Sequence, residues 1–119
     1  MSILLINETQ MLVMPKLAKR IGLNEAIFLQ QLYQRLNESK HVHDGHQWVP
    51  TSYEGWHEQF PFWSMSTIRR IIYKLEQEQL IITGKYNQLK IDKTKWYRIN
   101  FDALEAVYGE GIFAKVVQR

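Results

Sequence analysis

The sequence predicts one mostly helical α+β domain over residues 1–119. Three observations support this fold class. The length fits a single hydrophobic core, apolar residues recur at helical spacing in several segments before residue 80, and two later segments are rich in β-branched and aromatic residues. Hydrophobic residues make up 45% of the chain and charged residues 23%, which is a globular composition.

Two short apolar runs open the chain, at residues 3–6 and 11–14, and a turn-like segment with the sequence NETQ separates them. Runs of this length between turn residues are typical of edge strands or of a small hairpin. We therefore expect residues 1–14 to contribute short N-terminal strands.

A helical core should follow over residues 15–79. Pro15 can begin a short helix that reaches Lys19, because a first helical residue needs no N–H, and Gly22 ends it. Asn24 is a plausible N-cap of the next helix. Apolar residues of that helix recur at the i, i+3, i+4 and i+7 positions of one face: Leu29, Leu32, Tyr33 and Leu36.

The next segment combines a turn, a strand and a third helix. Asp44 and Gly45 form a turn signal that leads into a short strand. Thr51 and Glu54 have the spacing of a capping box, so a helix should occupy about residues 52–60. Three aromatic residues of this helix are expected to face inward: Tyr53, Trp56 and Phe60.

The fourth helix should occupy residues 64–79, with Ser64 as its N-cap. Its apolar stripe predicts a buried face made of Ile68, Ile71, Ile72 and Leu75. At 100° per residue the opposite side carries Ser66, Arg70, Tyr73 and Gln77, with Arg69 and Lys74 on the flanks. Any amphipathic helix needs a polar outer face, so this pattern alone is also consistent with a solvated surface.

A hairpin and a last helix should complete the chain. Residues 80–83 and 95–101 are β-rich and are joined by a basic loop that begins at Gly84, which predicts a β-hairpin. Asp102 indicates the start of a final helix within the C-terminal segment 102–119.

Helix, short strand, helix, tight turn, helix and basic hairpin is the order of a winged helix-turn-helix. In this interpretation residues 64–79 are the recognition helix and residues 80–101 are the wing. The turn with the sequence FPFWS has the length that holds two helices at a steep angle, which would present the recognition helix outward.

The charge distribution favours a polyanionic partner. Residues 63–99 contain eight basic and three acidic side chains, a net charge of +5, whereas the remainder contains seven basic and nine acidic ones, a net charge of −2. A basic third beside a mildly acidic body raises the local concentration of a negatively charged partner. Chance clustering on a solvated face is the alternative explanation.

DNA is the partner that these residue types suit. A recognition helix reads base edges near its N-terminus, arginine can present two parallel donors to guanine or phosphate, and lysines suit backbone contacts. The candidate residues on the helix are Ser64, Ser66, Thr67, Arg69, Arg70, Tyr73, Lys74 and Gln77. Those on the wing are Lys85, Tyr86, Lys90, Lys93 and Lys95. If six to eight of them neutralised phosphates, log K would fall with log salt at a slope of about −5 to −7.

Three segments resemble the N-terminal winged-helix domain of replication-initiation proteins from phages, prophages and plasmids of low-GC Gram-positive bacteria. They are MPKLAKRIGLNEAIFLQQLYQRLNES, DGHQWVPTSYEGWHEQFPFWSMSTIRRIIYKLE and DKTKWYRINFDALE. More distantly, IGLNEAIFLQQL is similar to the N-terminal domain of the primosome protein DnaD. The resemblance covers Leu4 to about Leu104.

This resemblance implies a winged-helix fold that binds DNA during replication initiation and recruits helicase-loading or other primosome proteins. It also implies self-association, in which the N-terminal apolar runs would form the edge of a dimer. Members of this family usually continue into a second, helical DNA-binding domain, whereas this sequence stops at Arg119.

Other classes of chemistry find little support. The chain has no cysteine, which excludes disulfides and thiolate catalysis. The segment HVHDGH could offer metal ligands, but a loop does not fix them dependably, so we expect no metal. No phosphate-binding glycine loop or nucleophile elbow is present, so we expect neither an enzyme nor a cofactor. The first apolar run is too short for a membrane span or signal peptide, and we expect a cytoplasmic protein.

Two other functions remain open for the same fold. A transcriptional repressor would use the same helix and wing at a promoter. An interaction scaffold would pair the N-terminal strands and the segment IFAKVV with other subunits, and its contacts with DNA would be incidental.

Overall fold

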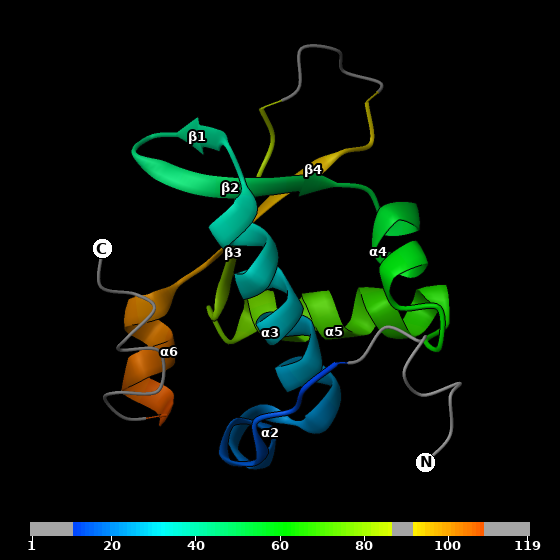
Figure 1. Ribbon diagram of the computed structural model, residues 1–119, viewed down its shortest axis with the longest axis vertical. Coiled ribbons are helices and arrows are strands. Elements are labelled where there is room, and N and C mark those ends of the chain that lie inside the picture. Colours follow the sequence, from blue (N-terminus) through cyan, green and yellow to red (C-terminus); the bar gives the residue numbers. More distant parts are fainter. Residues whose placement is uncertain (1–10, 87–91, 109–119) are drawn as a thin grey trace, which may run out of the picture.

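Five helices and one four-stranded antiparallel sheet make up residues 11–86 and 92–108, the part of the chain that the computed structural model describes (Figure 1). The helices are α2 (Pro15–Ile21), α3 (Leu23–Glu38), α4 (Tyr53–Gln59), α5 (Met65–Gln77) and α6 (Phe101–Tyr108). The strands are β1 (His41–His43), β2 (His46–Thr51), β3 (Ile81–Gly84) and β4 (Lys95–Ile99), in the order β1-β2-β4-β3. The expected α+β class is confirmed.

The predicted strand at residues 11–14 is not formed, and the other predicted N-terminal strand lies outside the described residues. The side-chain amide of Gln30 takes the place of a strand partner. Its Oε1 accepts a hydrogen bond of 3.0 Å from the Met14 N–H, and its Nε2 donates one of 3.0 Å to the Leu12 carbonyl. These backbone groups are therefore satisfied by α3 rather than by a sheet.

Gly22 joins α2 directly to α3. Its φ of 108° is a conformation that side chains disfavour, and it serves both as the last cap of α2 and as the first cap of α3. The expected N-cap at Asn24 is wrong, because the chain reverses within one residue and α3 begins at Leu23. The Ala26 N–H donates to the Gly22 carbonyl over 2.9 Å, which closes the first turn.

The predicted Asp44-Gly45 turn joins β1 and β2. Both residues have positive φ, 54° and 77°, as the tight two-residue turns of β-hairpins require. The cap of α4 is Ser52 and not Thr51, since the Ser52 hydroxyl accepts a 3.1 Å hydrogen bond from the Gly55 N–H. Thr51 is still part of β2 at that point, paired with β4.

The second hairpin forms as expected, with Ile81 of β3 opposite Ile99 of β4. Its second strand is shorter than predicted, because Phe101 already belongs to α6. The Asn100 side chain accepts a 3.2 Å hydrogen bond from the Ala103 N–H and so starts this helix before the predicted Asp102.

The core lies between the helices and one face of the sheet. The predicted stripe of α5 is buried, and α5 contacts α3, α4 and β3. Phe28 of α3 packs against Trp56 and Phe60, with ring centres 4.7 and 5.8 Å apart, and all three are fully buried. No helix within the described ranges is long and apolar enough to cross a membrane.

Candidate nucleic-acid interface

The outer face of α5 is polar and open to solvent. Five of its residues are exposed on this side: Ser66, Arg69, Arg70, Tyr73 and Gln77. Tyr73 exposes 63% of its surface, although the opposite side of the same helix is fully buried. Among the described residues, no acidic side chain lies within 4 Å of the guanidinium group of Arg69 or Arg70. The two positive charges are therefore uncompensated by short-range partners.

Hydroxyl groups gather at the N-terminus of α5. The Ser64 Oγ accepts a 3.1 Å hydrogen bond from the Thr67 N–H, which confirms Ser64 as the N-cap. The same oxygen donates to Thr67 Oγ1 over 3.0 Å and lies 3.1 Å from Ser66 Oγ. The start of the helix thus combines two exposed hydroxyls, Ser64 and Ser66, with backbone N–H groups that favour negative charge.

Tyr53 brings together two cations from different elements. The guanidinium carbon of Arg69 on α5 lies 5.0 Å from the centre of the Tyr53 ring, and Nζ of Lys95 at the start of β4 lies 5.4 Å from it. Lys95 Nζ also donates a 3.2 Å hydrogen bond to the Tyr53 hydroxyl. We call these three side chains the cation cluster. Attraction between each cation and the ring orients charges from the helix and the hairpin toward one place.

Lys74 has a different environment from the other predicted contacts. Its Nζ donates a 3.2 Å hydrogen bond to the Ile21 carbonyl, at the end of α2, and lies 3.7 Å from Glu25 Oε2. The side chain is 45% exposed, so this pair contributes little to stability by itself. Its charge nevertheless has a carboxylate partner at the α2–α3 turn, whereas Arg69 and Arg70 have none within the described residues, so Lys74 is the least available of the three to an external anion.

The predicted DNA contacts of the β3–β4 hairpin differ in their surroundings. Lys85 and Lys93 are exposed, whereas Lys90 lies outside the described residues. A hydrogen bond from the Thr94 N–H lowers the pKa of the Asp92 carboxyl, which keeps a negative charge beside these lysines.

Tyr86 packs on the sheet instead of extending into solvent. Its ring is stacked on that of His43, with centres 4.1 Å apart, and its hydroxyl donates a 3.0 Å hydrogen bond to Asp44. Burial and this hydrogen bond raise the pKa of the Tyr86 hydroxyl. Tyr86, predicted as a DNA contact of the wing, thus connects the β3–β4 hairpin to the β1–β2 hairpin.

The structure thus brings together Arg69 and Lys95 and keeps Arg70 and Tyr73 on the same helix face. Sequence reasoning missed Tyr53, which was assigned only to the core; it lies one residue after an N-cap, a position that often borders a surface. No group of three or more potential metal ligands gathers within residues 11–86 and 92–108. Comparisons with protein families, curated proteins and solved structures find no match to this chain.

Proposed function

We propose that this chain is a winged-helix DNA-binding protein. In this proposal α5 enters the major groove of duplex DNA, and the β3–β4 hairpin contacts the neighbouring sugar-phosphate backbone as the wing. The order of α3, β2, α4, α5 and the hairpin supports it, as does the tight turn at residues 60–64 between α4 and α5.

The cation cluster is the observation that carries this proposal. Arg69 and Lys95 are 26 positions apart in the sequence, yet both contact Tyr53. Among the described residues, no carboxylate forms an ion pair with either of them. Two like charges repel each other, so holding them together without an anion has a cost that the aromatic ring only partly offsets. A phosphodiester would neutralise both and would be oriented by helix and wing together.

The exposed face of α5 supplies groups that can read bases. Arg70 can donate two parallel hydrogen bonds to guanine, and Ser66 and Gln77 can bond to base edges or to the backbone. Tyr73 adds an exposed ring and hydroxyl on the same side of the helix. A helix fits the major groove, which is about 12 Å wide.

The biological setting that we propose is replication initiation of the phage or plasmid type, with helicase-loading or other primosome proteins as partners. The sequence resemblance supports this setting, and the geometry of the interface is compatible with it. Self-association as a dimer belongs to the same proposal, and light scattering of the purified chain would test it. A strictly monomeric chain at all concentrations would remove the dimer from the proposal.

Duplex affinity of the Arg69→Ala/Arg70→Ala variant tests DNA binding. We expect the variant to bind a fluorescein-labelled duplex at least about tenfold more weakly in fluorescence anisotropy, because each arginine contributes about 1–3 kcal/mol at a base or phosphate. Both side chains are exposed, so the fold should be unaffected.

Lys16→Ala/Lys19→Ala is the matched control. It removes the same charge from exposed positions on α2, which lies far from the hairpin (Figure 1). We expect less than about a twofold loss for this control. Equal losses in both variants would show that only net charge matters and would contradict a binding face on α5.

A further inference from the structure

The sheet carries a cluster of aromatic rings on the face that the helices leave uncovered. Val49 and Tyr97 pair across β2 and β4 and point into the core. Trp48 and Trp96, which precede these two residues, point to the other face of the sheet. Strand pairing places His41 of β1 opposite Trp48. With Tyr86, which follows β3, the rings on this outer face are His41, His43, Trp48, Tyr86 and Trp96. We call them the ring cluster.

The rings have a regular arrangement. His43 and Tyr86 are parallel within 4°, and Trp96 lies nearly perpendicular to both, with ring centres 5.1 and 5.7 Å away. His41 meets Trp96 at 80° and 5.2 Å. This pattern of parallel and edge-on contacts is the one that aromatic rings favour.

Specific contacts hold the cluster in position. Trp48 is only 3% exposed and lies beneath the other rings of the cluster. The Trp48 indole N–H donates a 3.0 Å hydrogen bond to the His43 carbonyl. Gly84 leaves room above β3, since a Cβ there would lie 3.2 Å from the Tyr86 ring and 3.5 Å from Trp48. The rings are thus fixed before any ligand arrives, which lowers the entropy cost of binding.

Part of this ordered surface is open to solvent. His41 is exposed, and His43, Tyr86 and Trp96 are only partly buried. In Figure 1, α3 and α5 lie on one side of the sheet, and no labelled helix lies on the other side. A cluster that served only as core would hide these rings as completely as it hides Trp48.

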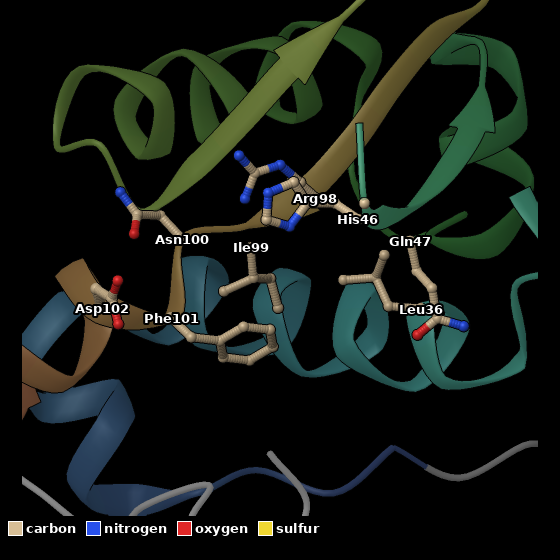
Figure 2. A pocket seen from close by; sticks show the side chains of 9 residues that line it. Leu36, His46, Gln47, Arg98, Ile99, Asn100, Phe101 and Asp102 are labelled. Atoms are coloured by element: carbon tan, nitrogen blue, oxygen red, sulfur yellow. The ribbon is translucent and has the colours of Figure 1, made fainter. Parts of the chain in front are cut away.

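The charge around the rings favours a polyanion. The described residues of the sheet and its turns, 40–51, 81–86 and 92–99, contain two acidic residues and five basic ones: Lys40, Lys85, Lys93, Lys95 and Arg98. The Arg98 guanidinium lies 5.3 Å from the centre of the Trp48 ring. Arg98 also lines a pocket of about 310 Å³ between the β1–β2 hairpin and the start of α6 (Figure 2).

We propose that the ring cluster binds single-stranded DNA by stacking unpaired bases. Bases would stack on the accessible surfaces of Trp96 and of the His43–Tyr86 pair, while Arg98 contacts a phosphate. The proposal rests on the proposed function in taking DNA as the ligand, and it adds a second surface for a strand that has left the duplex. The ring cluster and α5 occupy different faces, so their contributions can be separated.

Binding of a fluorescein-labelled oligothymidylate tests this proposal. We expect Trp96→Leu to weaken binding by about tenfold or more, since one stacked base contributes about 1–3 kcal/mol. Trp96→Phe, which retains a ring, should recover most of the affinity. Duplex binding should be unchanged in both variants, whereas Arg69→Ala/Arg70→Ala should weaken duplex binding far more than oligothymidylate binding.

Two measurements on the wild-type chain keep the test independent of variant folding. An abasic oligonucleotide of equal charge should bind much more weakly than oligothymidylate, and 5-iodouracil in the strand should cross-link to Trp96, Tyr86 or His43 under ultraviolet light. Equal affinity for the abasic strand, or cross-links only to α5, would overturn the proposal.

Two further results separate this proposal from the proposed function. If the wild-type chain does not bind duplex DNA but binds oligothymidylate in a way that requires Trp96, only the major-groove proposal is wrong. An oligoproline peptide that binds these rings when oligothymidylate does not would assign the surface to a protein partner and overturn stacking on bases.

Discussion

At the scale of single residues, Tyr97 places a phenol hydroxyl in the core. The side chain is fully buried, and its hydroxyl and the nearby Trp56 indole N–H interact without forming a hydrogen bond of good geometry, to each other or to another described residue. Burial raises the pKa of Tyr97 well above its usual value. The ring itself packs edge-on against Trp56, with centres 5.5 Å apart. The ring stabilises the core, and the hydroxyl contributes little.

We therefore expect Tyr97→Phe to leave the free energy of unfolding at pH 7 within about 1 kcal/mol of wild type, or to increase it. The two proteins should diverge at high pH. An unfolded tyrosine ionises near pH 10 and the folded one only at higher pH, so Tyr97 disfavours folding progressively as pH rises past about 10. Urea unfolding at pH 7 and 10.5 measures this. Parallel losses of stability in both proteins would show that Tyr97 is not the group responsible.

At the scale of elements, Gly22 controls how α2 meets α3. A side chain at its φ of 108° is strained, and a Cβ there would meet Glu25 Oε1, the far end of a flexible side chain. Glu25 would have to move, and with it the ion pair to Lys74 of α5. One residue without a side chain therefore permits both the turn between two helices and the link to a third.

Gly22→Ala should lower the free energy of unfolding by about 1–3 kcal/mol, which urea denaturation can measure. Gly45→Ala is the comparison, because Gly45 also has positive φ, 77°, but a Cβ added there would meet no atom within 4 Å. Gly45→Ala should lower the free energy of unfolding by about 1 kcal/mol, from backbone strain alone. A Gly22 variant that lowers the free energy of unfolding no more than the Gly45 variant would mean that neither the contact with Glu25 nor the φ of 108° at Gly22 has a large cost.

At the scale of the whole molecule, positive charge is concentrated on one set of elements. Five of the candidate cations remain available on α5 and the second hairpin after Lys74 is set aside: Arg69, Arg70, Lys85, Lys93 and Lys95. The sequence alone suggested six to eight phosphate contacts. Within the described residues Lys74 is already paired with Glu25 and the Ile21 carbonyl, which leaves these five cations, and Lys90 lies outside the described residues.

If these five cations all contact phosphates, they alone should make log K for duplex binding fall with log salt at a slope of about −4 to −5. The Arg69→Ala/Arg70→Ala variant should have a slope shallower by about 2 if both arginines contact phosphates, and by less if one of them reads a base. Anisotropy titrations at several salt concentrations measure both slopes. A slope near zero for the wild-type chain would contradict a backbone-contacting interface of any kind.

Periodicity in the sequence determined which segments are helices and which face of α5 is buried. Ile68 and Ile72 lie on the core side and Arg70 and Tyr73 on the solvent side, because 100° per residue fixes their relative directions wherever the helix packs. The β-rich composition of the segments on either side of the loop at Gly84 likewise predicted the β3–β4 hairpin. Helix starts were less predictable. Gly22, Ser52 and Asn100 cap their helices in place of the predicted Asn24, Thr51 and Asp102, because several residues near a helix boundary can satisfy the same local rule.

Only the tertiary structure decided which side chains meet. Tyr53 contacts both Arg69 and Lys95, Gln30 replaces a strand partner for residues 11–14, and Lys74 donates to the Ile21 carbonyl at the end of α2. The ring cluster brings His43 of β1 into contact with Trp96 of β4, although β2 lies between these two strands in the sheet. Local sequence fixes the direction of a side chain relative to its own backbone, whereas its partners depend on how distant segments pack.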